Sequence, residues 1–221
     1  MTKVAMATSS ASQTQPQIAG VLLAAGRSSR MDAHKLLLPL AGKPLIAHSL
    51  SAACASHARP ILLMLGRSAT QVEAALEPGS YSVVVNPRYT EGMGTTLALA
   101  ISSLPVEVIG AIILLGDQPL MTTAAIDTVL SAARQHPEHI IMGQYANHTS
   151  HPVYLPRRVF GQVTTLTGDA GARSIIAAER QALITVPIAD EFAAFDVDTL
   201  EDYARAQALL QSAQLSENNP R

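Results

Sequence analysis

At 221 residues, of which 48% are hydrophobic, the chain is long and apolar enough to fold as one large domain, and its composition excludes a wholly disordered protein. Charged residues make up only 14%, well below the roughly 25% of an average globular protein. The formal net charge of -2 excludes a basic surface for nucleic acid or an anionic membrane, so any anionic ligand must be bound by local positive charge.

The two ends of the chain are polar. Residues 1–17 and 211–221 are rich in Ser, Thr, Gln and Asn, and we expect flexible tails there, on either side of a single domain at residues 18–210. No stretch resembles a signal peptide or reaches the roughly 18 apolar residues of a membrane span. A single cysteine, Cys54, excludes an intrachain disulfide. These features predict a cytoplasmic protein without membrane or nucleic-acid partners.

Six short apolar segments have the pattern of strands that are buried on both faces. They are residues 18–25, 60–65, 81–86, 109–115, 139–143 and 182–187. Helical patterns follow or separate them, at residues 44–57, 68–77, 121–136, 171–181 and 199–211. This alternation predicts an α/β fold, a three-layer α/β/α sandwich around a mostly parallel, Rossmann-like sheet.

Ligands of such sheets bind beyond the carboxyl ends of the strands, where the loop after residues 18–25 carries basic residues. Gly26 allows close approach of the backbone, Ser28 and Ser29 offer hydroxyl groups, and Arg30 and Lys35 add positive charge. This set suits a polyphosphate. The alternative is that the basic residues are simply solvated.

Three carboxylates are predicted at the same edge. Asp117 follows the strand at 109–115, and Asp196 and Asp198 follow a short apolar segment. Carboxylates at strand ends can hold Mg²⁺ together with waters and phosphate oxygens. The alternatives are a turn residue for Asp117 and a helix cap for Asp198. Together with the cationic loop, the three carboxylates predict a metal site rather than three independent turns.

Several familiar motifs are absent. A P-loop would need a glycine where Leu37 stands, a dinucleotide fingerprint would need a glycine where Leu97 stands, and a nucleophile elbow would need one at Arg30. The seven histidines lack zinc-site spacing.

The stretch LAAGRSSRM (residues 23–31), followed by Lys35 and LAGKPL (residues 40–45), resembles the N-terminal signature of the nucleotidyltransferases with a GT-A-like fold. The segments LLGDQPLM, SHPVYLP, LTGDAGARSII and FDVDTLEDY are similar to the branch that includes molybdenum cofactor cytidylyltransferase. The resemblance covers residues 18–210. It implies Mg²⁺-dependent transfer of a nucleoside monophosphate to a phosphate-bearing acceptor, a molybdopterin-type molecule, with release of pyrophosphate.

The resemblance also implies roles for individual residues. It assigns catalysis to Arg30, Lys35 and Asp117, and nucleotide binding to Leu23, Ala24, Ala25, Gly26, Arg30, Lys35, Asn86 and Asp117. It assigns metal binding to Asp117 with Asp198 or Asp196, and acceptor binding to Lys43, Gly92, Gly94, Gln118, His151, Asp169 and Arg173. Lys43 has the alternative of a helix start, and Asn86 that of a turn residue beside Pro87.

Ala25 stands where guanylyl-transferring relatives carry a second glycine, which favours CTP over GTP. A molybdoenzyme that receives the cofactor is a further expected partner. Two alternatives are kept: a nucleotidyltransferase for a sugar, polyol or phospho-acid acceptor, and a non-catalytic carrier of the molybdenum cofactor.

Overall fold

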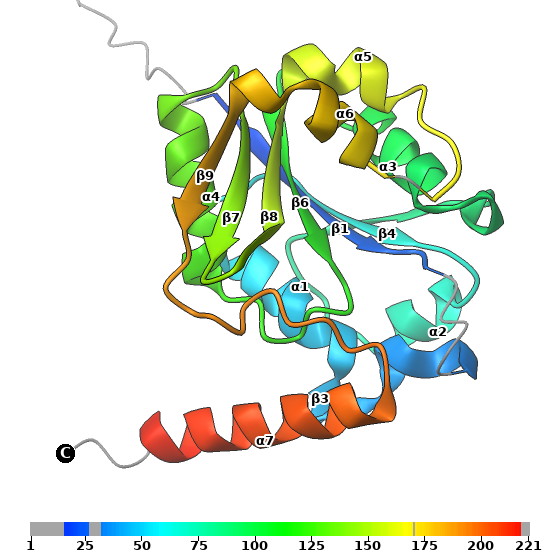
Figure 1. Cartoon of the computed structure of the whole chain (residues 1–221). Helices are drawn as coiled ribbons and strands as arrows, with labels where there is room; N and C mark the ends of the chain where they lie inside the picture. Colours follow the sequence, from blue (N-terminus) through cyan, green and yellow to red (C-terminus); the bar gives the residue numbers. More distant parts are fainter. Residues whose placement is uncertain (1–15, 27–31, 170, 218–221) are drawn as a thin grey trace, which may run out of the picture.

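The computed structural model describes residues 16–26, 32–169 and 171–217. Its centre is a seven-stranded sheet of strand order β5-β4-β1-β6-β8-β7-β9 (Figure 1). The strands are β1 (Ile18–Ala24), β4 (Ile61–Leu65), β5 (Ser82–Val85), β6 (Gly110–Leu115), β7 (Ile140–Tyr145), β8 (His148–Pro156) and β9 (Leu183–Pro187). Only β8 is antiparallel to its neighbours β6 and β7. The predicted α/β fold with a mostly parallel sheet is confirmed.

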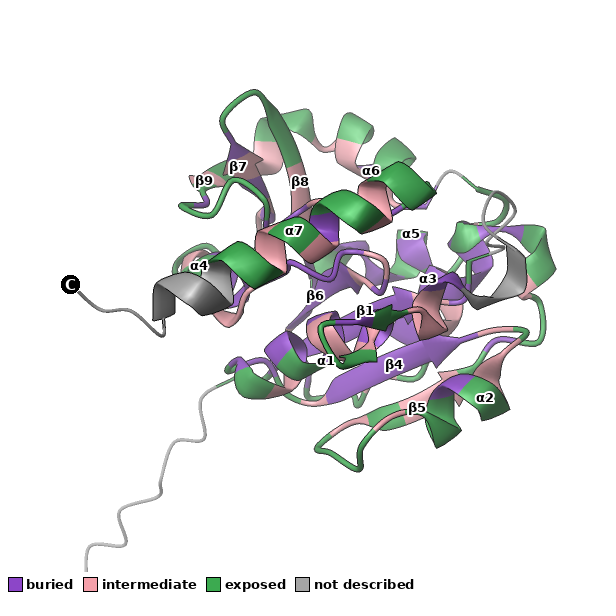
Figure 2. Ribbon diagram, turned by 90° about the horizontal axis from the view of Figure 1, so that it is seen from below, coloured by how far each residue is buried: buried purple, intermediate pink, exposed green. Residues whose placement is uncertain are grey.

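Helices cover both faces of this sheet. They are α1 (Leu45–Ala55) and α4 (Thr123–Gln135) on one face, and α3 (Met93–Ser102), α5 (Phe160–Val163) and α6 (Arg173–Ala178) on the other. Because side chains alternate along a strand, Leu22 packs with Ile46 and Ile126, while Val21 packs with Leu97. Figure 2 shows that β1, β4 and β6, at the centre of the sheet, are buried. No described helix is long and apolar enough to cross a membrane.

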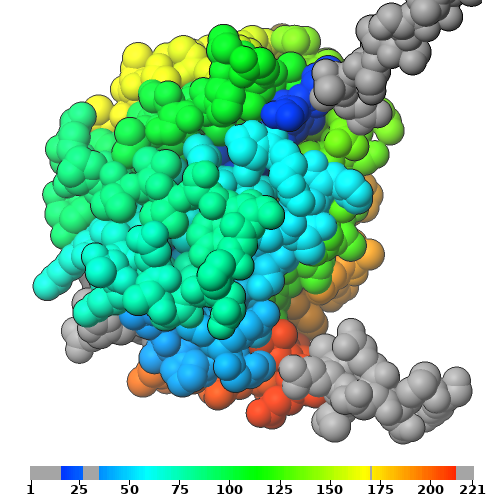
Figure 3. All heavy atoms as spheres, turned by 180° about the vertical axis from the view of Figure 1, so that it is seen from behind, coloured from blue at the N-terminus to red at the C-terminus, as the bar shows by residue number. Residues whose placement is uncertain are grey.

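A smaller layer covers the carboxyl edge of the sheet. It contains the 3₁₀ helix η1 (Asp32–Leu37), the hairpin of β2 (Pro39–Leu40) and β3 (Lys43–Pro44), and α7 (Leu200–Glu217). Helix α2 (Ala69–Ala74) instead packs through Val72 into the core on the α1 and α4 face of the main sheet. Leu40 and Leu45 pack against Val197 and Ala206, and the Tyr203 hydroxyl donates to the Pro39 carbonyl. Most other residues of α7 between Leu200 and Ser212 are exposed or half-buried (Figure 2). Seen from behind, α7 lies along the lower edge of the molecule (Figure 3).

Strand β8 and helix α3 are among the elements that were not predicted from the sequence. Strand β8 contains Pro152 and Pro156, which cannot donate to a ladder and therefore obscure the strand pattern. Helix α3 begins with Met93, which is followed by the weak helix formers Gly94, Thr95 and Thr96. Helix α7 also continues to Glu217, beyond the residue at which we expected the domain to end. Residues 1–15 and 218–221 lie outside the described part of the chain.

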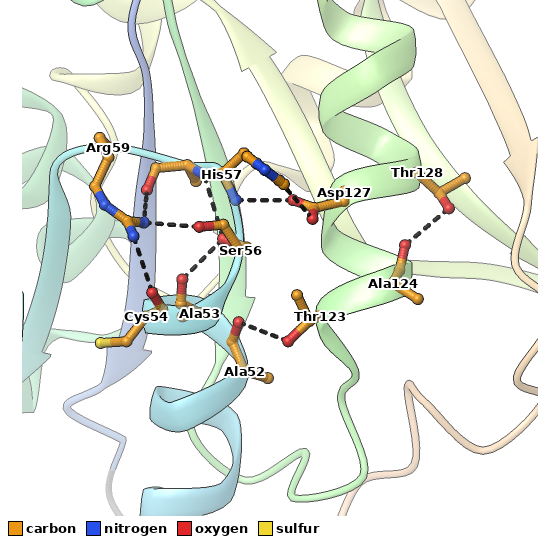
Figure 4. A network of polar contacts seen from close by, with 11 residues as sticks. Ala52, Ala53, Cys54, Ser56, His57, Arg59, Thr123, Ala124, Asp127 and Thr128 are labelled. Carbon is orange, nitrogen blue, oxygen red and sulfur yellow. Dashed lines mark hydrogen bonds and ion pairs between the residues drawn. The ribbon is translucent and has the colours of Figure 1, made fainter.

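Polar contacts connect the end of α1 to α4 (Figure 4). The backbone N–H of His57 donates to Asp127 Oδ1 at 2.9 Å, and Nδ1 of His57 lies 2.8 Å from Asp127 Oδ2. The Thr123 hydroxyl donates to the Ala52 carbonyl at 3.3 Å. The Arg59 guanidinium donates to three carbonyl groups at the end of α1. These contacts set the position at which the chain leaves α1 and enters β4.

We expect Asp127→Ala to lower the free energy of unfolding by about 1 kcal/mol, because both contacts to His57 are lost. Urea denaturation measures the change. Thr128→Ala is the matched control, since the exposed Thr128 hydroxyl bonds only within α4. Equal stability of Asp127→Ala and wild type would contradict the prediction.

Candidate active site

Three charged side chains from distant parts of the chain meet at the carboxyl edge of the sheet. Lys35 lies on η1, Asp117 follows β6, and Asp198 precedes α7. The Lys35 ammonium donates to Asp117 Oδ2 and to Asp198 Oδ1, each at 3.0 Å. The fold therefore brings together one residue of the cationic segment and two of the three carboxylates singled out in the sequence.

Lys35 is charged at neutral pH in this arrangement. Its side chain is only 10% exposed, against 30% for Asp117 and 50% for Asp198. Burial alone would lower the pKa of Lys35, but the charges and hydrogen bonds of Asp117 and Asp198 outweigh it, and the pKa is raised above its ordinary value. The ammonium thus lies beneath two carboxylates that face solvent.

Asp196 has a different partner. Its Oδ1 accepts a hydrogen bond from Gln118 Nε2 at 3.0 Å, and the same Nε2 lies 3.4 Å from the Ala194 carbonyl. Partial desolvation and the charge of Asp117 raise the pKa of the Asp196 carboxyl. Asp198, and not Asp196, therefore shares the Lys35 ammonium with Asp117.

Gln118 is fully buried, and its side chain is directed to the segment that carries Asp196. Its Oε1 has no hydrogen-bond partner among the described residues. Next to these contacts, the backbone N–H of Val197 donates a hydrogen bond to the Asp117 carbonyl at 3.0 Å. Gln118 connects the end of β6 to the segment before α7, and its contact with the acceptor stays a prediction.

The end of β1 approaches its neighbours closely. Leu23 and Ala25 are buried, Ala24 is half-buried, and the Gly116 N–H donates to the Leu23 carbonyl at 2.9 Å. A Cβ on Gly116 would lie 3.0 Å from Ala24 Cβ, so a larger residue would separate the two strand ends. Gly26 is exposed, with open space where its Cβ would lie. Arg30, assigned to the triphosphate, lies outside the described residues.

Asn86 faces helix α3. Its Nδ2 donates to Thr95 Oγ1 at 3.1 Å and Thr96 Oγ1 at 2.9 Å, and its Oδ1 accepts from the Arg88 N–H at 2.9 Å. These bonds use both hydrogens of the buried amide. Its contact with a nucleotide stays a prediction, and the observed role is to fasten the turn after β5 to α3.

The two glycines assigned to the acceptor side serve close packing. The Gly94 N–H donates to the Gly168 carbonyl at 2.8 Å. Gly92 has φ of 107°, and a Cβ there would lie 2.3 Å from the Gly168 carbonyl carbon and 2.5 Å from Asp169 Oδ1. Both positions therefore require glycine, and they set Asp169 against the start of α3.

His151 on β8 lies within electrostatic reach of both Asp117 and Arg173. Burial lowers the pKa of His151 to about 4, the charge of Asp117 opposes this shift, and that of Arg173 adds to it. The imidazole is therefore neutral at pH 7. The Tyr145 hydroxyl donates to the His151 carbonyl at 2.6 Å and anchors the backbone there.

Lys43 lies apart from this group. It is exposed on β3, and its Nζ lies 3.5 Å from Ser51 Oγ on α1. Its contact with the acceptor stays a prediction.

The donor set at the edge fits a metal ion that arrives with a phosphate. Among the side chains that the structure describes, no three His, Cys, Asp or Glu residues form a cluster suited to a metal. Asp117 and Asp198 nevertheless direct one oxygen each to a single cationic point, the Lys35 ammonium. Mg²⁺ typically takes one or two protein carboxylates and completes its shell with water and phosphate oxygens. Two convergent carboxylates meet that requirement.

Comparison with known proteins defines the family. The model of the MobA-like NTP transferase domain matches residues 20–183. The chain belongs to the MobA-like NTP transferase family. It is therefore a nucleotidyltransferase with a nucleoside triphosphate as substrate, as its motifs indicate.

Several relatives match over nearly their whole length. Nicotine blue oxidoreductase of Paenarthrobacter nicotinovorans is 30% identical over 86% of this chain and 96% of its own. Purine catabolism protein PucB of Bacillus subtilis is 28% identical over 85% and 95%. The crystal structure of Rv0371c from Mycobacterium tuberculosis has a TM-score of 0.78 and 30% identity, covering 88% of this chain and 99% of that one. The same protein is known in complex with manganese, with a TM-score of 0.75.

We expect Gln118→Glu to lower the free energy of unfolding at pH 7 by more than about 2 kcal/mol, because it places a buried carboxylate against Asp196. Burial raises the pKa of such a carboxyl, so the loss is present above that pKa and diminishes as the pH falls through it. Urea denaturation at pH 7 and pH 5 measures both effects. Gln162→Glu, exposed on α5, is the control; a loss of stability independent of pH would contradict this account.

Proposed function

We propose that this nucleotidyltransferase transfers CMP from CTP to a phosphate group of a molybdopterin-type acceptor and releases pyrophosphate. The convergence of Lys35, Asp117 and Asp198 at the carboxyl edge of the sheet is the observation that supports it most strongly. The motif resemblance and the MobA-like family support the acceptor class, and Ala25 supports CTP.

The proposed reaction is a displacement at phosphorus. An acceptor phosphate oxygen attacks the α-phosphorus, the bond to the α–β bridging oxygen breaks, and pyrophosphate departs with the bonding electrons. A phosphate nucleophile is already ionised at neutral pH, so no protein base is needed. Catalysis then depends on positioning and on the stabilisation of negative charge.

The described residues have separate proposed roles in positioning the substrates and stabilising negative charge. The Lys35 ammonium, kept protonated by its two partners, neutralises phosphate charge. Asp117 and Asp198 would hold a Mg²⁺ ion, which when bound supplies charge stabilisation to phosphate oxygens. A homologue in complex with manganese supports a divalent metal ion as the cofactor. Neutral His151, with Asp169 and Arg173, would face the acceptor.

A second candidate function, oxidoreductase activity, is favoured by the 30% identity to nicotine blue oxidoreductase. Against it, Gly92 and Gly94 pack on residues 167–168 and are not free to cradle a dinucleotide pyrophosphate. Oxidation of NADH or NADPH by the purified protein, without pyrophosphate release from any triphosphate, would favour this candidate.

Asp117→Asn is expected to lower pyrophosphate release by at least about 100-fold, because one of the two converging carboxylates is lost. A coupled pyrophosphate assay with CTP, Mg²⁺ and a molybdopterin-type acceptor measures the change, and circular dichroism checks that the fold is intact. Glu107→Gln, on the exposed turn before β6, is the control. Near-normal turnover by Asp117→Asn would contradict the proposed site.

CTP is expected to support faster pyrophosphate release than GTP, ATP or UTP, and Ala25→Gly should raise the relative rate with GTP. The reason is that Ala25 is buried at the end of β1, where the resemblance places the nucleotide. The assay compares kcat/KM for the four triphosphates. GTP preference in the wild type would contradict the assignment of CTP.

An acceptor screen at fixed CTP distinguishes the remaining alternatives. Turnover with a sugar phosphate, polyol phosphate or phospho-acid, and none with molybdopterin, would identify another acceptor. Binding of the cofactor without pyrophosphate release would favour a carrier.

A further inference from the structure

The Lys35 ammonium occupies the point at which the two proposed metal ligands converge. It is 3.0 Å from Asp117 Oδ2 and 3.0 Å from Asp198 Oδ1, and the residue is only 8% exposed. The two carboxylates are thereby satisfied by a cation that belongs to the chain itself. A divalent ion that used these two oxygens would have to replace the ammonium.

The charge of Lys35 weakens the attraction of this group for a metal ion alone. Two carboxylates and one ammonium leave a single net negative charge, half of what the carboxylates would present without Lys35. Asp196 is close enough to interact with Lys35 and both carboxylates, but its Oδ1 is held by Gln118. His151 is neutral and adds no charge. An ion alone therefore gains little and separates Lys35 from two partners.

A triphosphate changes this balance. It offers the ammonium new anionic partners, and it offers the ion the phosphate oxygens that complete its coordination shell. Lysine is suited to such an exchange, because its ammonium is a compact charge on a flexible four-carbon stem. Lys35 lies on η1, and the segment to which the resemblance assigns the nucleotide ends at Gly26, before η1 in the chain.

We propose that Lys35 is an internal counter-ion that keeps the Asp117–Asp198 site closed to free divalent ions and moves to the phosphates when metal and nucleotide bind together. This inference rests on the proposed function, because it takes a nucleoside triphosphate as the arriving anion. Metal and nucleotide then each favour binding of the other. The metal ion takes the place of the Lys35 ammonium on the two carboxylates, and the triphosphate gives the displaced ammonium new anionic partners.

The first test measures the affinity of the full chain for Mn²⁺ without nucleotide. Electron paramagnetic resonance detects the free ion and so gives the bound fraction. Lys35→Met should bind Mn²⁺ about tenfold more tightly than the wild type, and Lys35→Arg, which keeps the charge, should not. Lys43→Met is the matched control, because the Lys43 ammonium contacts Ser51 and neither carboxylate. Thermal denaturation checks that each variant is folded.

The second test measures binding of CTP by calorimetry in the presence of EDTA. Asp198→Asn should bind metal-free CTP several-fold more tightly than the wild type, because Lys35 loses one of the two partners that retain it. Asp196→Asn controls for the loss of negative charge alone, since Asp196 bonds to Gln118 and not to Lys35. It should change CTP affinity much less.

Equal Mn²⁺ affinity of wild type and Lys35→Met would overturn the inference, as would equal effects of Asp198→Asn and Asp196→Asn on CTP binding. Neither measurement requires turnover. Failure of the proposed function would appear separately, as absence of pyrophosphate release with every triphosphate and acceptor.

Discussion

The site depends on one interaction, the pairing of the Lys35 ammonium with the carboxylates of Asp117 and Asp198. Each group comes from a different part of the chain, and Lys35 is nearly buried. A charge in that position without partners would be strongly unfavourable. The three segments that carry Lys35, Asp117 and Asp198 must therefore come together in the folded protein, and the fold holds them in contact.

Two sets of contacts maintain that assembly. The end of β6 holds the segment before α7 through the Val197 N–H and the Gln118 side chain. Helix α7 begins with a capping box, in which the Asp202 N–H donates to Thr199 Oγ1 at 3.1 Å and the Thr199 N–H to Asp202 Oδ2 at 2.9 Å. Asp198 is thus fixed from both directions although its segment belongs to no strand of the sheet.

The side on which the acceptor is proposed to bind is built differently. Gly92 and Gly94 allow residues 167–169 to lie against the start of α3, and β8 brings His151 toward Asp117. These parts come from loops and from the one antiparallel strand, and relatives of similar length bear names as different as nicotine blue oxidoreductase and purine catabolism protein PucB. A shared scaffold with a variable acceptor side is consistent with that diversity, because function resides in the site and not in the fold.

The sequence by itself determined the α/β class, six of the seven strands of the main sheet, and the residue types at its carboxyl edge, since burial on both faces and turn chemistry leave local patterns. Only the tertiary structure decided that Asp198 faces Lys35 while Asp196 faces Gln118, and that Asn86 bonds to α3. It also placed β8 antiparallel between β6 and β7. The direction of a side chain at a strand end depends on packing against segments far along the chain, about which local periodicity carries no information.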